Sequence, residues 1–278
     1  MRFLKYHALG NDYLVIDPRT AEGPLSPHQI QQICHPHFGV GSDGILWGSP
    51  EAEAGTFSLR ILNPDGSEAE KSGNGLRIFS RFLWDEGAVA EAPFYIQTPG
   101  GRVEAVVRPD GREVTVEMGQ VSFSSERIPV SGPAREVLEE TIEVAEETLR
   151  YCAATIGNPH CVVLQKASEA DARRWGPLLE RAERFPNRTN VQFLEVLSRD
   201  RIRIQIWERG AGYTLASGSS SSAAAAVAHR MGWCDSEIGV EMPGGVLFIS
   251  ILPDFHIRMR GPVTRIAEGK LSSEIWKS

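Results

Sequence analysis

The sequence has few cysteines, no excess of basic residues and no long apolar run. Its four cysteines are scattered and form no CxxC pair, so neither a zinc site nor a disulfide framework is indicated, and a cytoplasmic location is expected. A net charge of −7 argues against nucleic-acid binding, because phosphates would go unneutralised. The N-terminus lacks an apolar signal core, and no stretch approaches a membrane span. No ligand cluster or dinucleotide-binding loop is present, so no metal and no organic cofactor are expected.

The length and composition of the sequence indicate two similar halves. Its 278 residues, 41% of them hydrophobic, suffice for two cores of about 130 residues each. Turn residues and alternating apolar residues predict mostly strands, with helices over 26–34, 75–86 and 168–183 and after Ser217. The order strand, turn, long helix and meander occurs twice, which predicts a duplicated α+β unit. We expect an N-terminal lobe of about residues 1–130 and a C-terminal lobe of residues 131–278, with the C-terminal strand free to cross over.

Two short segments carry most of the functional signal. Ser72-Gly73-Asn74-Gly75 and Ser217-Gly218-Ser219-Ser220 each run directly into a helix-forming stretch, as the N-terminus of a helix does. Such an end presents unpaired N–H groups and the positive end of the helix dipole, which suit a carboxylate or a phosphate. Either segment alone is equally typical of an ordinary capped helix. Together they favour a site for one small acid, held between two similar halves.

Several blocks along the whole chain carry a resemblance to a known family. They are Lys5-Tyr-His-Ala-Leu-Gly-Asn-Asp, Phe38-Gly-Val-Gly-Ser-Asp-Gly, Asn63-Pro-Asp-Gly-Ser-Glu-Ala-Glu-Lys-Ser-Gly-Asn-Gly, Gly157-Asn-Pro-His, Arg188-Thr-Asn-Val, Trp207-Glu-Arg-Gly-Ala-Gly-Tyr-Thr-Leu-Ala-Ser-Gly, Met242-Pro-Gly-Gly and Arg260-Gly-Pro. In these blocks the chain resembles the diaminopimelate epimerases, and more broadly the cofactor-independent epimerases and racemases. The resemblance implies two pseudo-symmetric lobes, each a mostly antiparallel sheet wrapped around a central helix, with the site in the cleft between them. It also implies an isomerase of amino-acid biosynthesis, specifically of lysine.

One departure from the family concerns the catalytic positions themselves. The family places a cysteine at each helix start, one to remove the α-proton of an amino acid and the other to return it from the opposite face. Here both positions are serine, Ser72 and Ser217. A thiol ionises near pH ~8.5, and lower at a helix N-terminus, whereas a serine hydroxyl needs a neighbouring base. Lys71 and the run Ser219–Ser222 also depart from the usual pattern, which favours natural drift over a two-site knockout.

The resemblance also implies a set of binding residues. Six match positions that hold the distal ammonium and carboxylate of the substrate: Asn11, Asn63, Asn158, Asn190, Glu208 and Arg209. Four match positions whose backbone amides hold the reacting carboxylate: Gly73, Asn74, Gly218 and Ser219. Asn63 and Asn158 each lie beside a proline, so a role in turn geometry is a competing interpretation for them. The competing interpretation for Glu208 and Arg209 is a surface ion pair. Asp43 and Asp65, which precede glycines, are interpreted as turn-formers.

Three functions therefore remain open from the sequence. The first is an epimerase acting on diaminopimelate or a related amino acid, impaired or rearranged because serines replace the thiols. The second is a related small-acid isomerase that uses Lys71, Glu70 or Glu208 as its base. In the serine-based reaction, His160 of the matched motifs could assist one serine but not both. The third is a non-catalytic homologue that binds an amino acid. The expected partner is a small amino acid or dicarboxylate, and a homodimer is left open.

Overall fold

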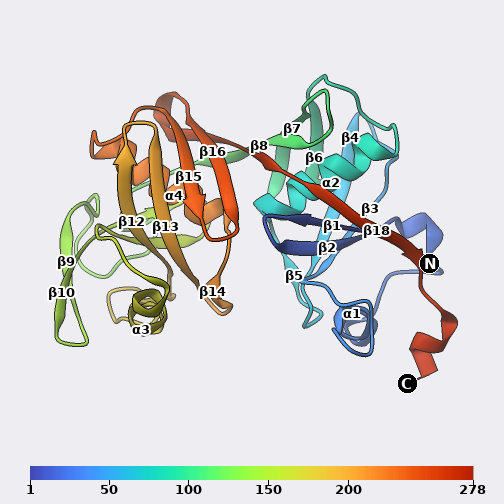
Figure 1. Cartoon of the computed structure of the whole chain (residues 1–278), viewed down its shortest axis with the longest axis horizontal. Helices are drawn as coiled ribbons and strands as arrows, with labels where there is room; N and C mark the ends of the chain where they lie inside the picture. The colour runs from blue at the N-terminus through green and yellow to red at the C-terminus, as the bar shows by residue number, and fades with distance from the viewer. Residues whose placement is uncertain (278) are drawn as a thin grey trace. The chain divides into compact units, whose positions relative to one another are not determined.

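The computed structural model describes residues 1–277, which divide into two compact units. The first unit is Met1–Glu117 together with the chain from Arg260, and the second is Met118–Met259. Relative to the expected lobes of 1–130 and 131–278, the second unit begins earlier and the C-terminal segment belongs with the first. The chain leaves the first unit inside strand β8 (Glu113–Gln120) and returns to it inside β17 (His256–Pro262) (Figure 1).

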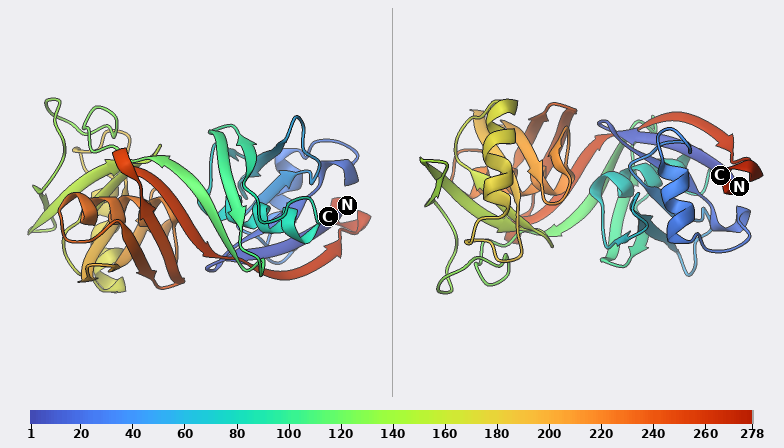
Figure 2. Two further views of the ribbon diagram at one scale, coloured as in Figure 1. Left: turned by 90° about the horizontal axis from the view of Figure 1, so that it is seen from above. Right: turned by 90° about the horizontal axis from the view of Figure 1, so that it is seen from below.

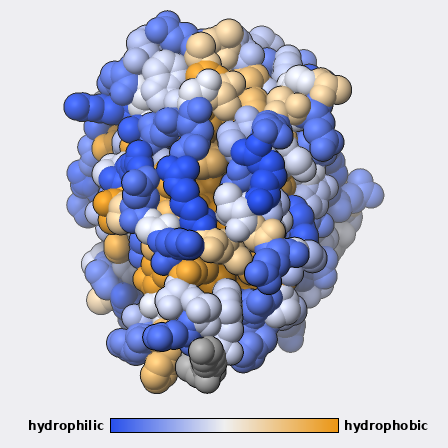
Figure 3. Space-filling view, turned by 90° about the vertical axis from the view of Figure 1, so that its right-hand side faces the viewer, coloured by the Kyte–Doolittle hydropathy of each residue, from blue (hydrophilic) through white to orange (hydrophobic). Residues whose placement is uncertain are grey.

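The first unit places one helix, α2 (Gly73–Asp85), against strands on its buried face. Leu76, Ile78, Phe79, Phe82 and Leu83 of this helix are all buried. The strands are β1 (Arg2–Ala8), β2 (Asn11–Ile16), β3 (Ile45–Gly48), β4 (Thr56–Leu62), β5 (Glu68–Ala69), β6 (Phe94–Thr98), β7 (Gly101–Val107), the start of β8, and β18 (Thr264–Lys270). Helix α1 (Pro27–Cys34) and the short 3-10 helices η1 (Pro18–Thr20) and η3 (Ser273–Lys277) complete the unit. The face of this unit in Figure 3 mixes hydrophilic side chains with apolar ones.

The second unit is built in the same way around α4 (Gly218–Arg230). The helix is made almost entirely of small residues, and its run Ala223–Ala226 is fully buried, so the surrounding strands approach it closely. The strands are β9 (Glu140–Val144), β10 (Glu147–Thr155), β11 (Pro159–Val163), β12 (Asn190–Ser198), β13 (Arg201–Glu208), β14 (Gly212–Thr214), β15 (Glu237–Met242) and β16 (Gly245–Ile251). A 3-10 turn, η2 (Pro253–Phe255), precedes β17. The acidic stretch 136–147 lies inside this unit and includes β9.

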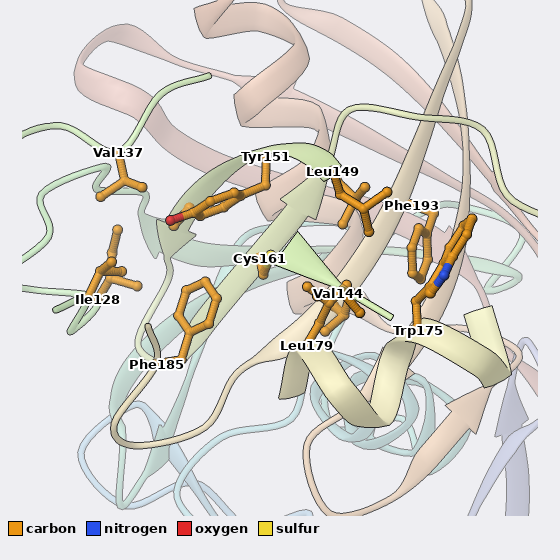
Figure 4. Close-up of a cluster of buried hydrophobic side chains, with 14 of the residues drawn as sticks. Ile128, Val137, Val144, Leu149, Tyr151, Cys161, Trp175, Leu179, Phe185 and Phe193 are labelled. Carbon is orange, nitrogen blue, oxygen red and sulfur yellow. The ribbon is translucent and has the colours of Figure 1, made fainter. Parts of the chain in front are cut away.

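Helix α3 (Glu169–Glu180) covers a second core in this unit. It lies against the strands of its own unit (Figure 2), and its Trp175 and Leu179 point into a cluster of buried side chains with Tyr151, Phe185 and Phe193 (Figure 4). The rings of Trp175 and Phe193 have centroids 5.9 Å apart. This packing fixes the C-terminal end of α3, where Glu180 lies.

The strand pairings show that the two units repeat one plan. In the first unit β2 pairs parallel with β3, β3 antiparallel with β4, and β4 parallel with β6, with α2 between β5 and β6 in the chain. In the second unit β11, β12, β13 and β15 pair in the same three senses, with α4 between β14 and β15. Most other pairings are antiparallel. The expected duplicated α+β fold, with a mostly antiparallel sheet around a central helix, is confirmed.

The helix starts follow the local sequence signals. Ser26 caps α1 in a capping box with Gln29, and Pro27 occupies the first helical position, as the sequence predicts. Ser72 and Ser217 cap α2 and α4, so both helices begin at the glycine that follows the serine. The first of these starts is two residues earlier than the expected 75–86. Both predicted helix N-termini are therefore real, and each of the two units carries one.

Candidate active site

In the first unit, Ser72 lies at the start of α2 with its side chain partly exposed. Its backbone is extended, and its Oγ accepts a hydrogen bond of 3.0 Å from the backbone N–H of Gly75. Within residues 1–277 this is the hydroxyl's one hydrogen bond. A Cβ at Gly75 would lie 3.0 Å from the Leu46 side chain and 3.3 Å from Ser72 Oγ, so glycine keeps the first turn of the helix open next to the serine. Ser72 is thus a well-placed cap whose hydroxyl is engaged by the first turn of its own helix.

A relay of side-chain hydrogen bonds orients two of the expected binding residues. The guanidinium of Arg77, which is fully buried, donates to Asn74 Oδ1 at 2.8 Å. Asn74 Nδ2 then donates to Asn11 Oδ1 at 3.0 Å, and Asn11 Nδ2 donates to Asp43 Oδ2 at 2.8 Å. Asp43 also accepts from the N–H of Asp12 at 3.0 Å. The donors all point the same way, from the cation to the carboxylate, so the orientation of both amides is fixed.

Asn63 is held by its own turn. Its Nδ2 donates to Ser67 Oγ at 2.9 Å, and its backbone N–H donates to the carbonyl of Ser67 at 2.8 Å. Asp65 accepts from both the N–H and the hydroxyl of Ser67, at 2.9 and 2.6 Å. These contacts support the interpretation that Asn63 and Asp65 stabilise a turn, which the sequence analysis gave as the alternative to ligand binding.

In the second unit, Ser217 lies next to a carboxylate. Ser217 is 6% exposed, and its Oγ accepts from the N–H of Ser220 at 3.4 Å. The carboxylate of Glu208 accepts a hydrogen bond of 3.2 Å from Thr214 Oγ1 and lies near the Ser217 hydroxyl. Burial raises the pKa of Glu208, and the nearby hydroxyls of Ser217 and Thr214 offset part of that rise. A serine hydroxyl needs a neighbouring base to exchange a proton, and the partly buried carboxylate of Glu208 is such a neighbour for Ser217.

Arg209 does not form the ion pair with Glu208 that the sequence suggests as an alternative. Its side chain is exposed, and Nη1 donates to the carbonyl of Asn187 at 3.0 Å. The backbone N–H of Arg209 donates to Asn190 Oδ1 at 3.0 Å, while Asn190 Nδ2 donates to the carbonyl of Pro159 at 2.9 Å. Both polar atoms of the Asn190 side chain are therefore used in hydrogen bonds that hold the end of β13. The guanidinium of Arg209 faces solvent.

Asn158 connects the start of β11 to the start of α4. Its Nδ2 donates to Ser219 Oγ at 3.4 Å, and its Oδ1 lies 2.9 Å from Nε2 of His160. His160 is fully buried, and burial lowers its pKa to about 3, so the ring is neutral at neutral pH. The neighbours of His160 are Asn158 and Gln192, and no hydrogen bond in the described chain joins it to Ser217. His160 is a buried structural group, and the suggestion that it assists this serine has no contact to support it.

Glu180, which the sequence analysis does not single out, clamps the turn that carries Glu208. The carboxylate is 3% exposed, accepts from Trp207 Nε1 at 2.8 Å and from the N–H of Gly210 at 3.1 Å, and forms an ion pair with Arg188. Burial acts to raise the pKa of Glu180, but the hydrogen bonds outweigh it, and the pKa lies below its ordinary value. Residues on both sides of Glu208 are thus held by one buried carboxylate.

We expect Glu180→Gln to destabilise the protein by about 1–3 kcal/mol, because an amide cannot accept all of these charge-assisted bonds. Denaturant unfolding at neutral pH measures the loss. Glu183→Gln is the matched control, because Glu183 is exposed. Since the folded pKa of Glu180 is lowered, its contribution is complete above the ordinary glutamate pKa of about 4.3 and disappears as the pH falls through the folded value. An equal effect of both substitutions at neutral pH would contradict this role.

The described residues hold no group of three or more histidine, cysteine, aspartate or glutamate side chains arranged to bind a metal ion. All four cysteines are buried and free. None of the helices within residues 1–277 is long and apolar enough to cross a membrane. The chemistry of the site therefore has to be sought in its serines, amides, carboxylates and helix N-termini.

Solved structures of proteins named epimerases have the same fold as this chain. Two solved structures share the fold: a predicted epimerase from Pseudomonas aeruginosa (17% identity, TM-score 0.71, covering 97% of this chain and 98% of that one), and a hydroxyproline epimerase from Agrobacterium vitis (16% identity, TM-score 0.68, covering 98% and 90%). At these identities the likeness concerns the fold alone.

Sequence comparison gives the family. The family model for diaminopimelate epimerase matches residues 3–124 and 152–266. The chain is 60% identical over 277 residues to diaminopimelate epimerase 2 of Nostoc sp. (strain PCC 7120), covering 99% of this chain and 97% of the relative. It is 40% identical over 278 residues to the diaminopimelate epimerase of Synechococcus sp. (strain JA-2-3B'a(2-13)), covering 97% of each. The chain belongs to the diaminopimelate epimerase family and is an isomerase of the amino-acid epimerase type, as its motifs predict.

Proposed function

We propose that this protein moves the α-proton of diaminopimelate, or of a closely related amino acid, without a cofactor and with serine in place of the family's thiols. The observation that carries the proposal is the partly buried carboxylate of Glu208 near the hydroxyl of Ser217, the cap of α4. A hydroxyl alone is too weak an acid and base at neutral pH, but a carboxylate beside it can take up its proton as it receives one from carbon.

In each unit, the backbone N–H groups at the start of the central helix are able to hold a carboxylate. Gly73 and Asn74 begin α2, and Gly218 and Ser219 begin α4. These groups have no intrahelical acceptor, and the positive end of each helix dipole stabilises the negative charge that develops as the α-proton leaves. We assign the distal carboxylate of the substrate to Arg209, whose guanidinium is exposed and able to form a two-pronged contact.

Lys71 is the main candidate for a different chemistry, that of a small-acid isomerase with a lysine base. Burial lowers the pKa of Lys71, and the charge of Glu117 partly restores it. No hydrogen bond joins Lys71 to the hydroxyl of Ser72 in residues 1–277. The contact between Ser217 and Glu208 therefore favours the serine-based reaction.

The proposal is tested first by binding. Isothermal titration calorimetry with the three stereoisomers of diaminopimelate is expected to give binding in the micromolar to millimolar range, with Arg209→Ala weakening it about tenfold or more. Arg127→Ala is the control, because Arg127 is also exposed and lies outside the proposed site. Absence of heat at millimolar ligand would refute diaminopimelate as the ligand. Binding without any exchange of the α-hydrogen for deuterium would leave an amino-acid-binding protein.

A further inference from the structure

Asp43 lies at the end of a chain of hydrogen bonds that begins at Arg77, and the two ends fix the direction of every bond between them. A guanidinium can only donate, so the oxygen of Asn74 must face Arg77, at 2.8 Å. An ionised carboxylate can only accept, so the nitrogen of Asn11 must face Asp43, also at 2.8 Å. The bond of 3.0 Å from Asn74 Nδ2 to Asn11 Oδ1 agrees with both ends. The orientation of the Asn11 amide is therefore set from two sides.

This orientation leaves Asn11 with an N–H group to offer to a ligand. Its side chain is partly exposed, whereas Asn74 is buried. Nδ2 of Asn11 carries two hydrogens: one is donated to Asp43, and the other has no acceptor in residues 1–277. The amide contacts Asn74, the second residue of α2, at the helix end whose backbone N–H groups are able to hold a carboxylate. The second hydrogen of Asn11 is thus suited to the same anion.

The backbone before Asn11 has a conformation that needs support from its surroundings. Leu9 has a φ of 56°, in the left-handed region that bulky residues rarely adopt, and Gly10 has a φ of 91°. Asp43 holds the far side of this turn, because its Oδ2 also accepts from the N–H of Asp12 at 3.0 Å. Backbone strain of this kind persists only where the neighbouring structure holds it, and it gathers at functional sites.

Other bonds keep the Asp43 loop in place when the Asp43 side chain is removed. Lys5 Nζ donates to the carbonyl of Gly41 at 2.7 Å, and Ser42 Oγ donates to the carbonyl of Asp12 at 3.1 Å. The backbone N–H of Asp43 donates to the same carbonyl at 3.1 Å. Because Asp43 is also exposed, its substitution is expected to release the Asn11 amide without unfolding the unit.

We propose that Asp43 is a positioning residue for substrate recognition: it acts through Asn11, whose free N–H it keeps available to a carboxylate at the start of α2. This inference rests on the proposed function and deepens it by adding a side-chain donor to the backbone N–H groups of the helix. The resemblance implies a distal role for Asn11, whereas its bond to Asn74 places the amide at the helix start. The sequence analysis interprets Asp43 as a turn-former, and its carboxylate has this further role.

A double-mutant cycle, measured by isothermal titration calorimetry with meso-diaminopimelate, tests the inference. Asn11→Ala is expected to weaken binding about tenfold or more, because a hydrogen bond to a charged group is lost, and Asp43→Ala about three- to tenfold. Since Asp43 acts through Asn11, adding Asp43→Ala to Asn11→Ala should weaken binding by less than about twofold more. Losses that multiply in the double variant would show two independent roles and would overturn the inference.

Asp43→Asn is the conservative variant, because its amide oxygen is still able to accept from Asn11 and from the N–H of Asp12. We expect it to bind within about threefold of the wild type. Asp110→Ala is the matched control: Asp110 is also exposed and accepts a backbone N–H, that of Arg112 at 2.9 Å, in a turn of the same unit. Its affinity should equal that of the wild type. Equal losses in Asp43→Asn and Asp43→Ala would also overturn the inference.

The outcomes separate this inference from the proposed function. Circular dichroism and denaturant unfolding verify that each variant is folded. A folded wild type that binds no diaminopimelate at millimolar concentration would refute the proposed function together with the inference. Wild-type binding that is unchanged in folded Asn11→Ala or in folded Asp43→Ala would refute the inference alone.

Discussion

The double substitution Ser72→Cys with Ser217→Cys is expected to raise α-proton exchange by about 10²–10⁴-fold and to yield inversion of configuration. A thiol at a helix N-terminus is partly ionised near neutral pH, so each cap then becomes a base and, once protonated, an acid. The helix N-termini that stabilise the developing charge remain in place. Deuterium incorporation and chiral analysis for the wild type, both single variants and the double variant measure the effect.

The two single variants should differ from one another. Ser72→Cys is expected to give the larger gain, because the Ser72 hydroxyl is hydrogen-bonded only to the N–H of Gly75 in residues 1–277, whereas Ser217 has Glu208 nearby. Ser217→Cys alone should increase exchange at one configuration and add little inversion. Equal gains from the two would argue that Glu208 does not assist Ser217.

Alkylation provides the control for the new thiols. The native cysteines are all buried, and burial raises the pKa of Cys34 to about 12 and that of Cys152 to about 11. Iodoacetamide should therefore leave the wild type active and remove the activity gained by the double variant. If the double variant binds ligand but is inert, the altered run Ser219–Ser222 has moved the site away from proton transfer, and a binding role follows.

Local chemistry made much of the fold predictable from the sequence. Caps at Ser26, Ser72, Ser168 and Ser217 are short-range signals, and all four mark real helix starts. The boundary between the units was not readable in this way. The chain changes unit inside β8 and again inside β17, and a continuous strand leaves no linker composition to recognise. The two-residue strand β5 is likewise too short for alternation to reveal.

The candidate site shows the same limit. Spacing and resemblance pointed to Ser217 and Glu208 separately, yet their proximity depends on the turn between β13 and β14. Glu180 lies within the helix expected over 168–183, and nothing near it in sequence indicates that it clamps Trp207 and Gly210. Its partners come from a different strand, so only the packing of α3 brings them together. The roles of the other matched binding residues stay predictions.

Arg77 provides the second large effect, on stability. We expect Arg77→Ala to lower the free energy of unfolding by about 2–4 kcal/mol, because it leaves a cavity and an unsatisfied Asn74 Oδ1 in a buried setting. Burial lowers the pKa of Arg77 to about 9, so the buried charge itself is costly to maintain. Arg77→Met, which fills more of the cavity without the charge, should therefore lose less than Arg77→Ala.

The Arg77 experiment also separates packing from orientation of the site. Denaturant unfolding of Arg77→Ala, Arg77→Met and the exposed control Arg108→Ala gives the stability differences, with the control expected to change by less than about 0.5 kcal/mol. Arg77→Met should nevertheless weaken ligand binding, because without the guanidinium the amides of Asn74 and Asn11 lose the donor that orients them. Wild-type affinity in a stable Arg77→Met variant would show that Asp43, at the other end of the relay, is sufficient to hold both amides in place.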